Sequence, residues 1–149
     1  MKYMLLIYMN ENAINGPERE QCYKDSTQLT HDLHATGQFL GAGPLQPVAT
    51  ATSVRVREGK RLVTDGPFAE TREQLGGYFL VDAADLDAAI SIAARIPGAR
   101  KGTVEIRPLI EIPGLPKPQR ARIQIRRWNR FAEFRAPPDR FDQPPAIRT

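Results

Sequence analysis

Two helix-like segments, each set between short strand-like runs, constrain the fold of this chain more than any other feature of its sequence. The chain opens on an apolar run of strand length, and the polar break that follows it favours a buried strand. The order is β-α-β, a hairpin, then β-α-β. It predicts an α+β fold: a ferredoxin-like antiparallel sheet with two helices on one face. The strand-like runs cover residues 2–9, 38–40, 50–57, 61–64, 77–81 and 103–112, and the helix-like segments cover 17–35 and 85–95.

Each helix-like segment carries a start signal. Pro17 is followed by Glu18, and Asp85 begins the second segment as its cap; prolines and carboxylates are favoured at helix N-termini. The predicted inner face of the first helix draws on Tyr23, Thr27, Leu29, Thr30, Leu33 and His34. The predicted apolar stripe of the second helix consists of Leu86, Ala89, Ile90 and Ala93.

The face of the sheet away from the helices needs a cover. A domain of about 110 residues has a modest core, and a second copy is the usual cover in a small chain. We therefore expect a homodimer.

The charge is divided unevenly along the chain. From Pro113 onward there are nine Lys and Arg against three Asp and Glu, whereas residues 1–112 carry 12 against 14. The first part therefore lacks the basic footprint of a nucleic-acid-binding domain. We predict a domain over residues 1–112 and an irregular, basic, Pro- and Arg-rich extension over 113–149. One hypothesis is that this extension contacts nucleic acid. The alternative is a disordered extension that has no function.

Composition limits the cellular setting. The one cysteine, Cys22, excludes an intramolecular disulfide and suits a reducing cytoplasm, which is the expected location. No run of 18 apolar residues is present, so no membrane helix is expected.

The run V-T-D-G-P-F-A-E-T-R-E-Q-L-G-G-Y-F-L-V, residues 63–81, strongly resembles the signature of the YCII-related family, in its DGPF-domain branch. The resemblance extends to M-K-Y-M-L-L-I-Y, to L-Q-P-V-A-T-A-T-S-V-R-V-R and to P-G-A-R-K-G-T-V-E-I-R-P. It covers residue 1 to about residue 112 and implies a dimeric α+β barrel of ferredoxin-like protomers.

The resemblance implies less about function. Most members of this branch have no established activity, and some accompany extracytoplasmic-function sigma factors. A more distant branch includes a lyase-like enzyme whose His on the first helix pairs with an Asp after the second strand. The His position falls near Ser26 here, and L-Q-P-V after Pro44 contains no Asp. That mechanism therefore does not carry over.

Asp65 is the first candidate for chemistry, as a general acid/base at a strand end beside Phe68. The alternative is an Asx turn in which Asp65 accepts backbone N–H groups and Gly66 takes an unusual φ. Glu70 is a candidate second carboxylate or a turn residue. Arg72 is a candidate anion clamp or a partner in a surface ion pair.

Aromatic residues complete the predicted substrate-binding set. Phe68, Tyr8 and Tyr78 are candidates to line a pocket, with core or interface packing as the alternative. His34 is a candidate base; with His31 it lacks a third ligand at a recognisable spacing, so no metal and no cofactor are expected.

Two functions remain open from the sequence. One is cofactor-free acid/base catalysis, lyase- or isomerase-like, on a small molecule, with Asp65, Glu70 and Arg72 in the site. The other is a non-catalytic ligand-binding or regulatory module linked to a sigma-factor system.

Overall fold

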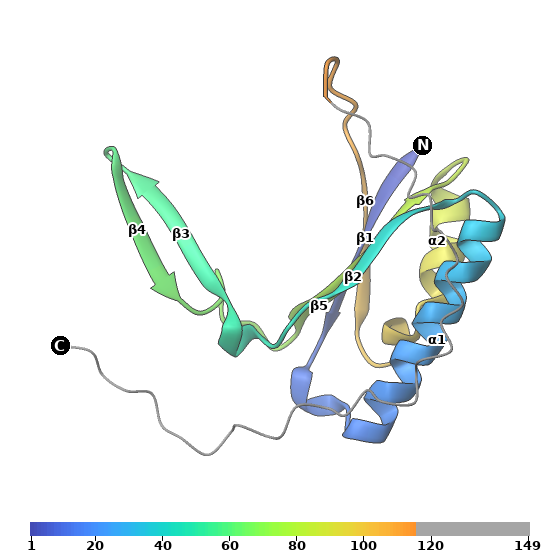
Figure 1. The fold of residues 1–149 in the computed structure, drawn as a ribbon, viewed down its shortest axis with the longest axis horizontal. Coiled ribbons are helices and arrows are strands. Elements are labelled where there is room, and N and C mark those ends of the chain that lie inside the picture. Colours follow the sequence, from blue (N-terminus) through green and yellow to red (C-terminus); the bar gives the residue numbers. More distant parts are fainter. Residues whose placement is uncertain (116–149) are drawn as a thin grey trace, which may run out of the picture.

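A computed structural model describes residues 1–115 of the chain and shows one four-stranded antiparallel sheet with both helices on one face (Figure 1). The sheet order is β2-β5-β1-β6, in which each neighbouring pair is antiparallel. The predicted ferredoxin-like α+β fold is confirmed. The sheet consists of β1 (Lys2–Met9), β2 (Phe39–Pro44), β5 (Gln74–Asp82) and β6 (Thr103–Pro108), and the helices are α1 (Gly16–Ala35) and α2 (Leu86–Arg95).

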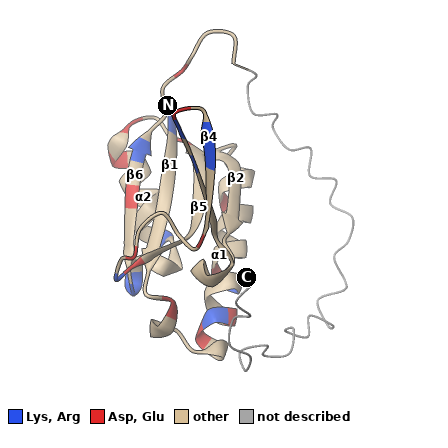
Figure 2. Ribbon diagram, turned by 90° about the vertical axis from the view of Figure 1, so that its left-hand side faces the viewer, with Lys and Arg blue, Asp and Glu red and all other residues tan. Residues whose placement is uncertain are grey.

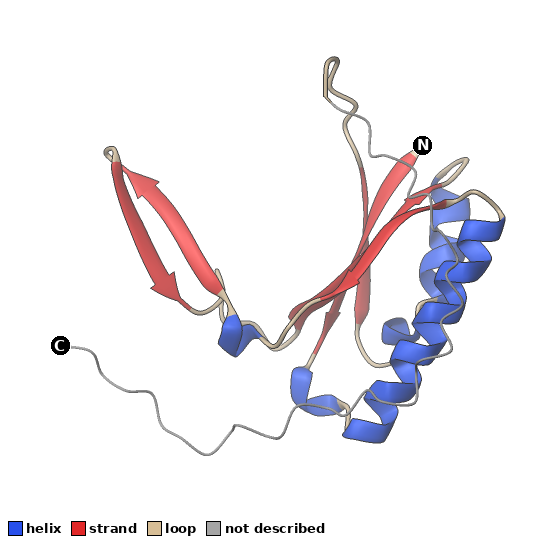
Figure 3. Ribbon diagram, in the orientation of Figure 1, coloured by secondary structure: helices blue, strands red, loops and turns tan. Residues whose placement is uncertain are grey.

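A hairpin of β3 (Thr52–Arg57) and β4 (Lys60–Asp65) forms a separate two-stranded sheet between β2 and β5 in the chain. It projects away from the four-stranded sheet, on the side opposite the helices (Figure 3). Its turn is at Glu58 and Gly59, in the gap between the predicted strands 50–57 and 61–64, and both residues have positive φ angles, 50° and 75°. Short 3-10 turns cover Glu11–Ala13, Val48–Thr50 and Pro97–Arg100.

The start of α1 is defined by a capping box that the sequence prediction did not include. The side chain of Asn15 accepts a hydrogen bond of 3.0 Å from the backbone N–H of Glu18, and the Glu18 carboxylate accepts one of 3.3 Å from the N–H of Asn15. The second helix begins as predicted, since Asp85 accepts from the N–H of Ala88 at 2.8 Å. Both helices end at the predicted residues.

The core lies between the helices and the sheet. Leu5, Leu33 and Val81 are fully buried there, and Phe79 is nearly so. The prediction of inner-face residues is wrong in part, because Tyr23, Thr27 and His34 on α1 are exposed. On α2 the predicted Leu86 and Ile90 are about half exposed, while Ile92, which the prediction omitted, is buried.

Gly77 lets the backbones of two neighbouring strands approach one another. A Cβ on Gly77 would lie 2.9 Å from the carbonyl oxygen of Gly43 across the β2–β5 pair, which is closer than a carbon atom tolerates. The Gly76-Gly77 pair thus belongs to strand β5, and its role is strand packing.

Candidate functional site

The main hollow of the described part lies between the middle of α1 and the sheet, with a volume of about 370 Å³. Its walls on the sheet side are mostly apolar. They include Ile7 and Met9 from β1 and Phe39 from β2, together with Phe79 from β5, and Ile96 follows α2. Such a mix of apolar walls and few polar groups is typical of small-molecule sites.

The hollow exists because the side chains on the inner face of α1 are small at positions 22 and 26 and large at positions 29 and 33. Residues 22, 26, 29 and 33 follow the spacing of one helical face. The two later positions, Leu29 and Leu33, are buried and fill the core. The two earlier positions hold Cys22 and Ser26, which are half-buried and too small to fill the same space.

Uncharged polar groups face the hollow from α1. The hydroxyls of Thr27 and Thr30 donate to helix carbonyls, at 2.8 Å to Tyr23 and 2.6 Å to Thr27. Burial raises the pKa of the Cys22 thiol, and this effect outweighs the opposite influence of the neighbouring Ser26 hydroxyl. The thiol is therefore protonated at neutral pH.

The structure brings one predicted site residue to this hollow, Tyr78. Tyr78 alternates with the buried Phe79 along β5, and its ring lies over β2, where a Cβ on Gly43 would approach it to 3.3 Å. Tyr8 is half-buried on β1 and lies outside the residues that line the hollow.

Asp65 ends β4 and is exposed. Gly66 has the unusual φ expected of the turn, 107°, but the Asp65 carboxylate accepts no hydrogen bond from the described residues. The Asx-turn bond weighed for Asp65 is therefore not formed here. Instead, the loop is held by the backbone N–H of Gly66, which donates to Ala51 at 2.7 Å, and by the Ser53 hydroxyl.

Phe68 is 83% exposed and lies against the hairpin, with the guanidinium carbon of Arg55 at 5.9 Å from the ring centroid. Glu70 and Arg72 are exposed in the same loop. The surface ion pair given as the alternative role of Arg72 is not found among residues 1–115. None of these side chains lines the hollow.

His34 is exposed near the end of α1. Within the described residues no group of three or more His, Cys, Asp and Glu side chains could hold a metal ion. No helix in this part of the chain has the length and hydrophobicity needed to cross a membrane.

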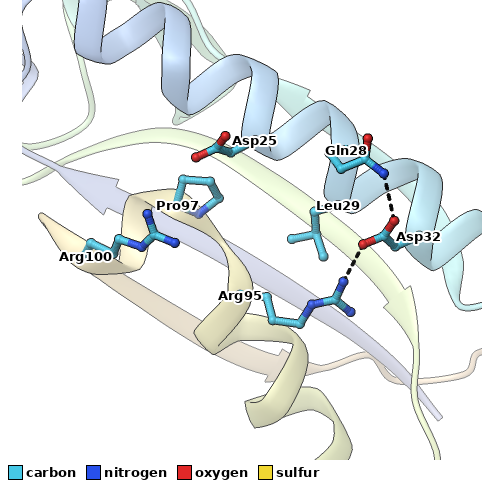
Figure 4. Close-up of a pocket in the computed structure, with 7 residues that line it drawn as sticks. All are labelled: Asp25, Gln28, Leu29, Asp32, Arg95, Pro97 and Arg100. Atoms are coloured by element: carbon cyan, nitrogen blue, oxygen red, sulfur yellow. Dashed lines mark hydrogen bonds and ion pairs between the residues drawn. The ribbon is translucent and has the colours of Figure 1, made fainter.

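A second, more open hollow of about 340 Å³ lies between α1 and the region after α2 (Figure 4). Asp32 accepts from Gln28 at 2.9 Å and pairs with Arg95 at 2.7 Å. Both partners of this ion pair are about half exposed, so it adds little stability. This hollow is the more open of the two, which makes it the weaker candidate for a ligand site.

Comparison with known proteins gives a family match. The model of the YCII-related domain matches residues 1–113. The chain belongs to the YCII-related family. An uncharacterised protein of Rhizobium meliloti (strain 1021) is 36% identical to this YCII-related chain over 118 residues, which cover 73% of the chain and 92% of the relative.

Apart from Tyr78, the residues that line the main hollow were not predicted as site residues, because most of them are apolar or small. The available signal was the pair of small residues at positions 22 and 26, where an amphipathic helix would carry leucines like those at 29 and 33.

Proposed function

We propose that this YCII-related protein binds a small, neutral and largely apolar molecule in the hollow between α1 and strands β1, β2 and β5. The hollow itself carries the proposal: its volume lies within the usual range of ligand pockets, roughly 300–1,000 Å³. The thiol of Cys22 and the hydroxyl of Ser26 are the groups that would orient a ligand by hydrogen bonds.

The proposed ligand is neutral because the residues that line the hollow include no Asp, Glu, Lys, Arg or His. An ionised group placed there would lose its hydration and gain no counter-charge, which is costly. A hydroxyl or carbonyl group, in contrast, would find donors and acceptors on α1.

The chemistry of the wall favours binding over covalent catalysis. The thiolate is the nucleophilic form of cysteine, and burial of Cys22 favours the thiol. The carboxylates predicted for acid/base work do not line the hollow.

A binding screen with a filled-pocket variant tests the proposal. The panel consists of neutral phenols and cyclic alcohols, with benzoate as the anionic comparison. Ala42 is exposed on β2 and lines the hollow, so Ala42→Trp should fill its mouth and weaken binding of the best neutral compound by at least about tenfold. Ala94 is exposed on α2 outside the hollow, which makes Ala94→Trp the control. Equal binding by both variants would show that the hollow is not the site.

Acid/base catalysis by Asp65, Glu70 and His34, with Arg72 as a clamp, stays a prediction. If Asp65 acts in catalysis, Asp65→Asn abolishes turnover of a bound compound while the fold is kept. A folded Asp65→Asn protein that treats every compound as the wild type does would end this hypothesis.

The remaining partner predictions also stand as proposals. We propose a homodimer, because no element of residues 1–115 covers the face of the sheet away from the helices (Figure 1).

The link to a sigma-factor system would be tested by a pull-down of sigma factor with the full chain. Nucleic-acid contact concerns the basic extension, of which residues 116–149 lie outside the described part; duplex binding with and without residues 113–149 over a salt series decides it.

A further inference from the structure

The hairpin β3–β4 presents apolar side chains to solvent. Val54 and Val63 are opposite one another across the two strands, and Val56 lies on the same face. Their exposed fractions are 59% for Val54, 55% for Val63 and 61% for Val56. The three valines share this face with Thr52, Arg61 and Asp65, and no described residue buries them.

A two-stranded hairpin of this kind needs a partner surface. An isolated hairpin is marginally stable at best in water, and an apolar strand face gains stability only when it is covered. In the described part of this protein the hairpin forms its own sheet, separate from the four strands of the main sheet. What holds it locally is its base, through bonds of Gly66 with Ala51 and Ser53.

The four-stranded sheet has a complementary surface. Side chains alternate along its strands, so the face opposite the helices carries Met4, Leu6 and Leu80 beside Tyr8 and Tyr78. The helices lie on the other side of this sheet (Figure 1). No element of residues 1–115 covers these apolar side chains (Figure 1).

Charge also favours a second copy as the occupant. Residues 52–65 carry four Lys and Arg against two Asp and Glu, whereas the rest of residues 1–112 carries eight against 12. Figure 2 shows the basic residues on β4 in blue. The rest of the domain therefore has a net negative charge, which favours the approach of the cationic hairpin of another copy.

We propose that the hairpin β3–β4 is a dimerisation arm, which lays its valine face on the open sheet face of a second copy of this chain. In a twofold dimer each copy gives one arm and receives one, so both apolar surfaces are buried. This inference rests on the homodimer proposed above and adds the segment that makes the contact.

A matched pair of single substitutions tests the arm by sedimentation of the full chain over a concentration series. Val63→Asp places a carboxylate on the valine face, and Thr64→Asp places the same group on the next residue, opposite Ser53 on the other face. Both positions are exposed, so the protomer should fold in each variant. We expect Val63→Asp to raise the dimer dissociation constant at least about tenfold, and Thr64→Asp to change it less than about threefold.

Cross-linking between two preparations identifies the contact directly, and it decides the question if Val63→Asp fails to fold. Both preparations carry Cys22→Ala; one adds Val63→Cys, and the other, with a tag that changes its mass, adds Leu6→Cys. A short bismaleimide should join the two masses after mixing, and Thr64→Cys in place of Val63→Cys should do so far less.

The outcomes of these experiments distinguish failure of the proposed arm from failure of the proposed homodimer. A wild-type chain that stays monomeric at every concentration overturns both. A dimer that is unaffected by Val63→Asp, or that gives no cross-link between positions 63 and 6 of different copies, overturns the arm alone. Ligand binding in the hollow is measured separately and bears on neither result.

Discussion

The hydroxyl of Ser53 donates a hydrogen bond of 2.8 Å to the carbonyl of Gly66, the second residue of the Asp-Gly-Pro-Phe run. This bond fixes the loop to the first strand of the hairpin, and the N–H of Gly66 fixes it to Ala51. The most recognisable motif of the sequence therefore closes the base of the hairpin.

The closure depends on the backbone conformation of Gly66, whose φ of 107° is open to glycine and strained for other residues. We expect Gly66→Ala to destabilise the hairpin by about 1–3 kcal/mol. Amide hydrogen exchange over residues 52–65 would show this as lost protection. Gly16→Ala is the control, since Gly16 has open space around it and no positive φ. Equal protection in both variants would contradict the assigned role of Gly66.

The Glu18 carboxylate joins the start of α1 to the turn after α2. The Lys101 ammonium, whose Nζ lies 2.6 Å from Oε1, lowers the pKa of Glu18, with a smaller effect of the Asn15 N–H. A lowered folded-state pKa contributes stability above the unfolded value, and this contribution is lost as the pH falls through the folded value. Thermal unfolding from about pH 7 to about pH 3 should show Glu18→Gln slightly less stable than the wild type at neutral pH, with the difference vanishing in acid. Glu20→Gln, at an exposed neighbouring position without a bond to a described residue, should follow the wild type throughout.

Cys22 should be a slow nucleophile. Burial raises the pKa of its thiol, so the thiolate fraction near neutral pH is smaller than in a free thiol. We expect alkylation by iodoacetamide to be slower than that of N-acetylcysteine, with a rate that rises at higher pH. A compound that binds in the hollow should slow the reaction further, because Cys22 lines it. Reaction as fast as that of the free thiol would show that Cys22 is not shielded.

The two isoleucines of α2 give a direct test of which face is buried. Ile92 is 4% exposed and Ile90 is 48% exposed. Ile92→Ala should lower the free energy of unfolding by about 2–4 kcal/mol, because it leaves a cavity in the core. Ile90→Ala should cost less than about 1 kcal/mol. Urea unfolding of the two variants measures both values, and a reversed order would mean that the helix is rotated from its described position.

The local signals in the sequence were sufficient for the elements and their order. The conformations of turns and helix caps depend on only a few neighbouring residues. The sequence therefore predicts the hairpin between 50–57 and 61–64 and the cap at Asp85 correctly. The resemblance carried by residues 63–81 also identified the family, which the domain match confirms.

Which side chains face inward was decided by the tertiary structure. The stripe predicted for α2 missed Ile92, because a ten-residue apolar helix offers more than one plausible face and only packing on the sheet selects one. For the same reason the candidate site in the structure differs from the predicted one. Asp65 has the chemistry of an acid/base but lies exposed at a strand end. Cys22 and Ser26 line a hollow only because the sheet lies opposite them and their small side chains leave the space between unfilled.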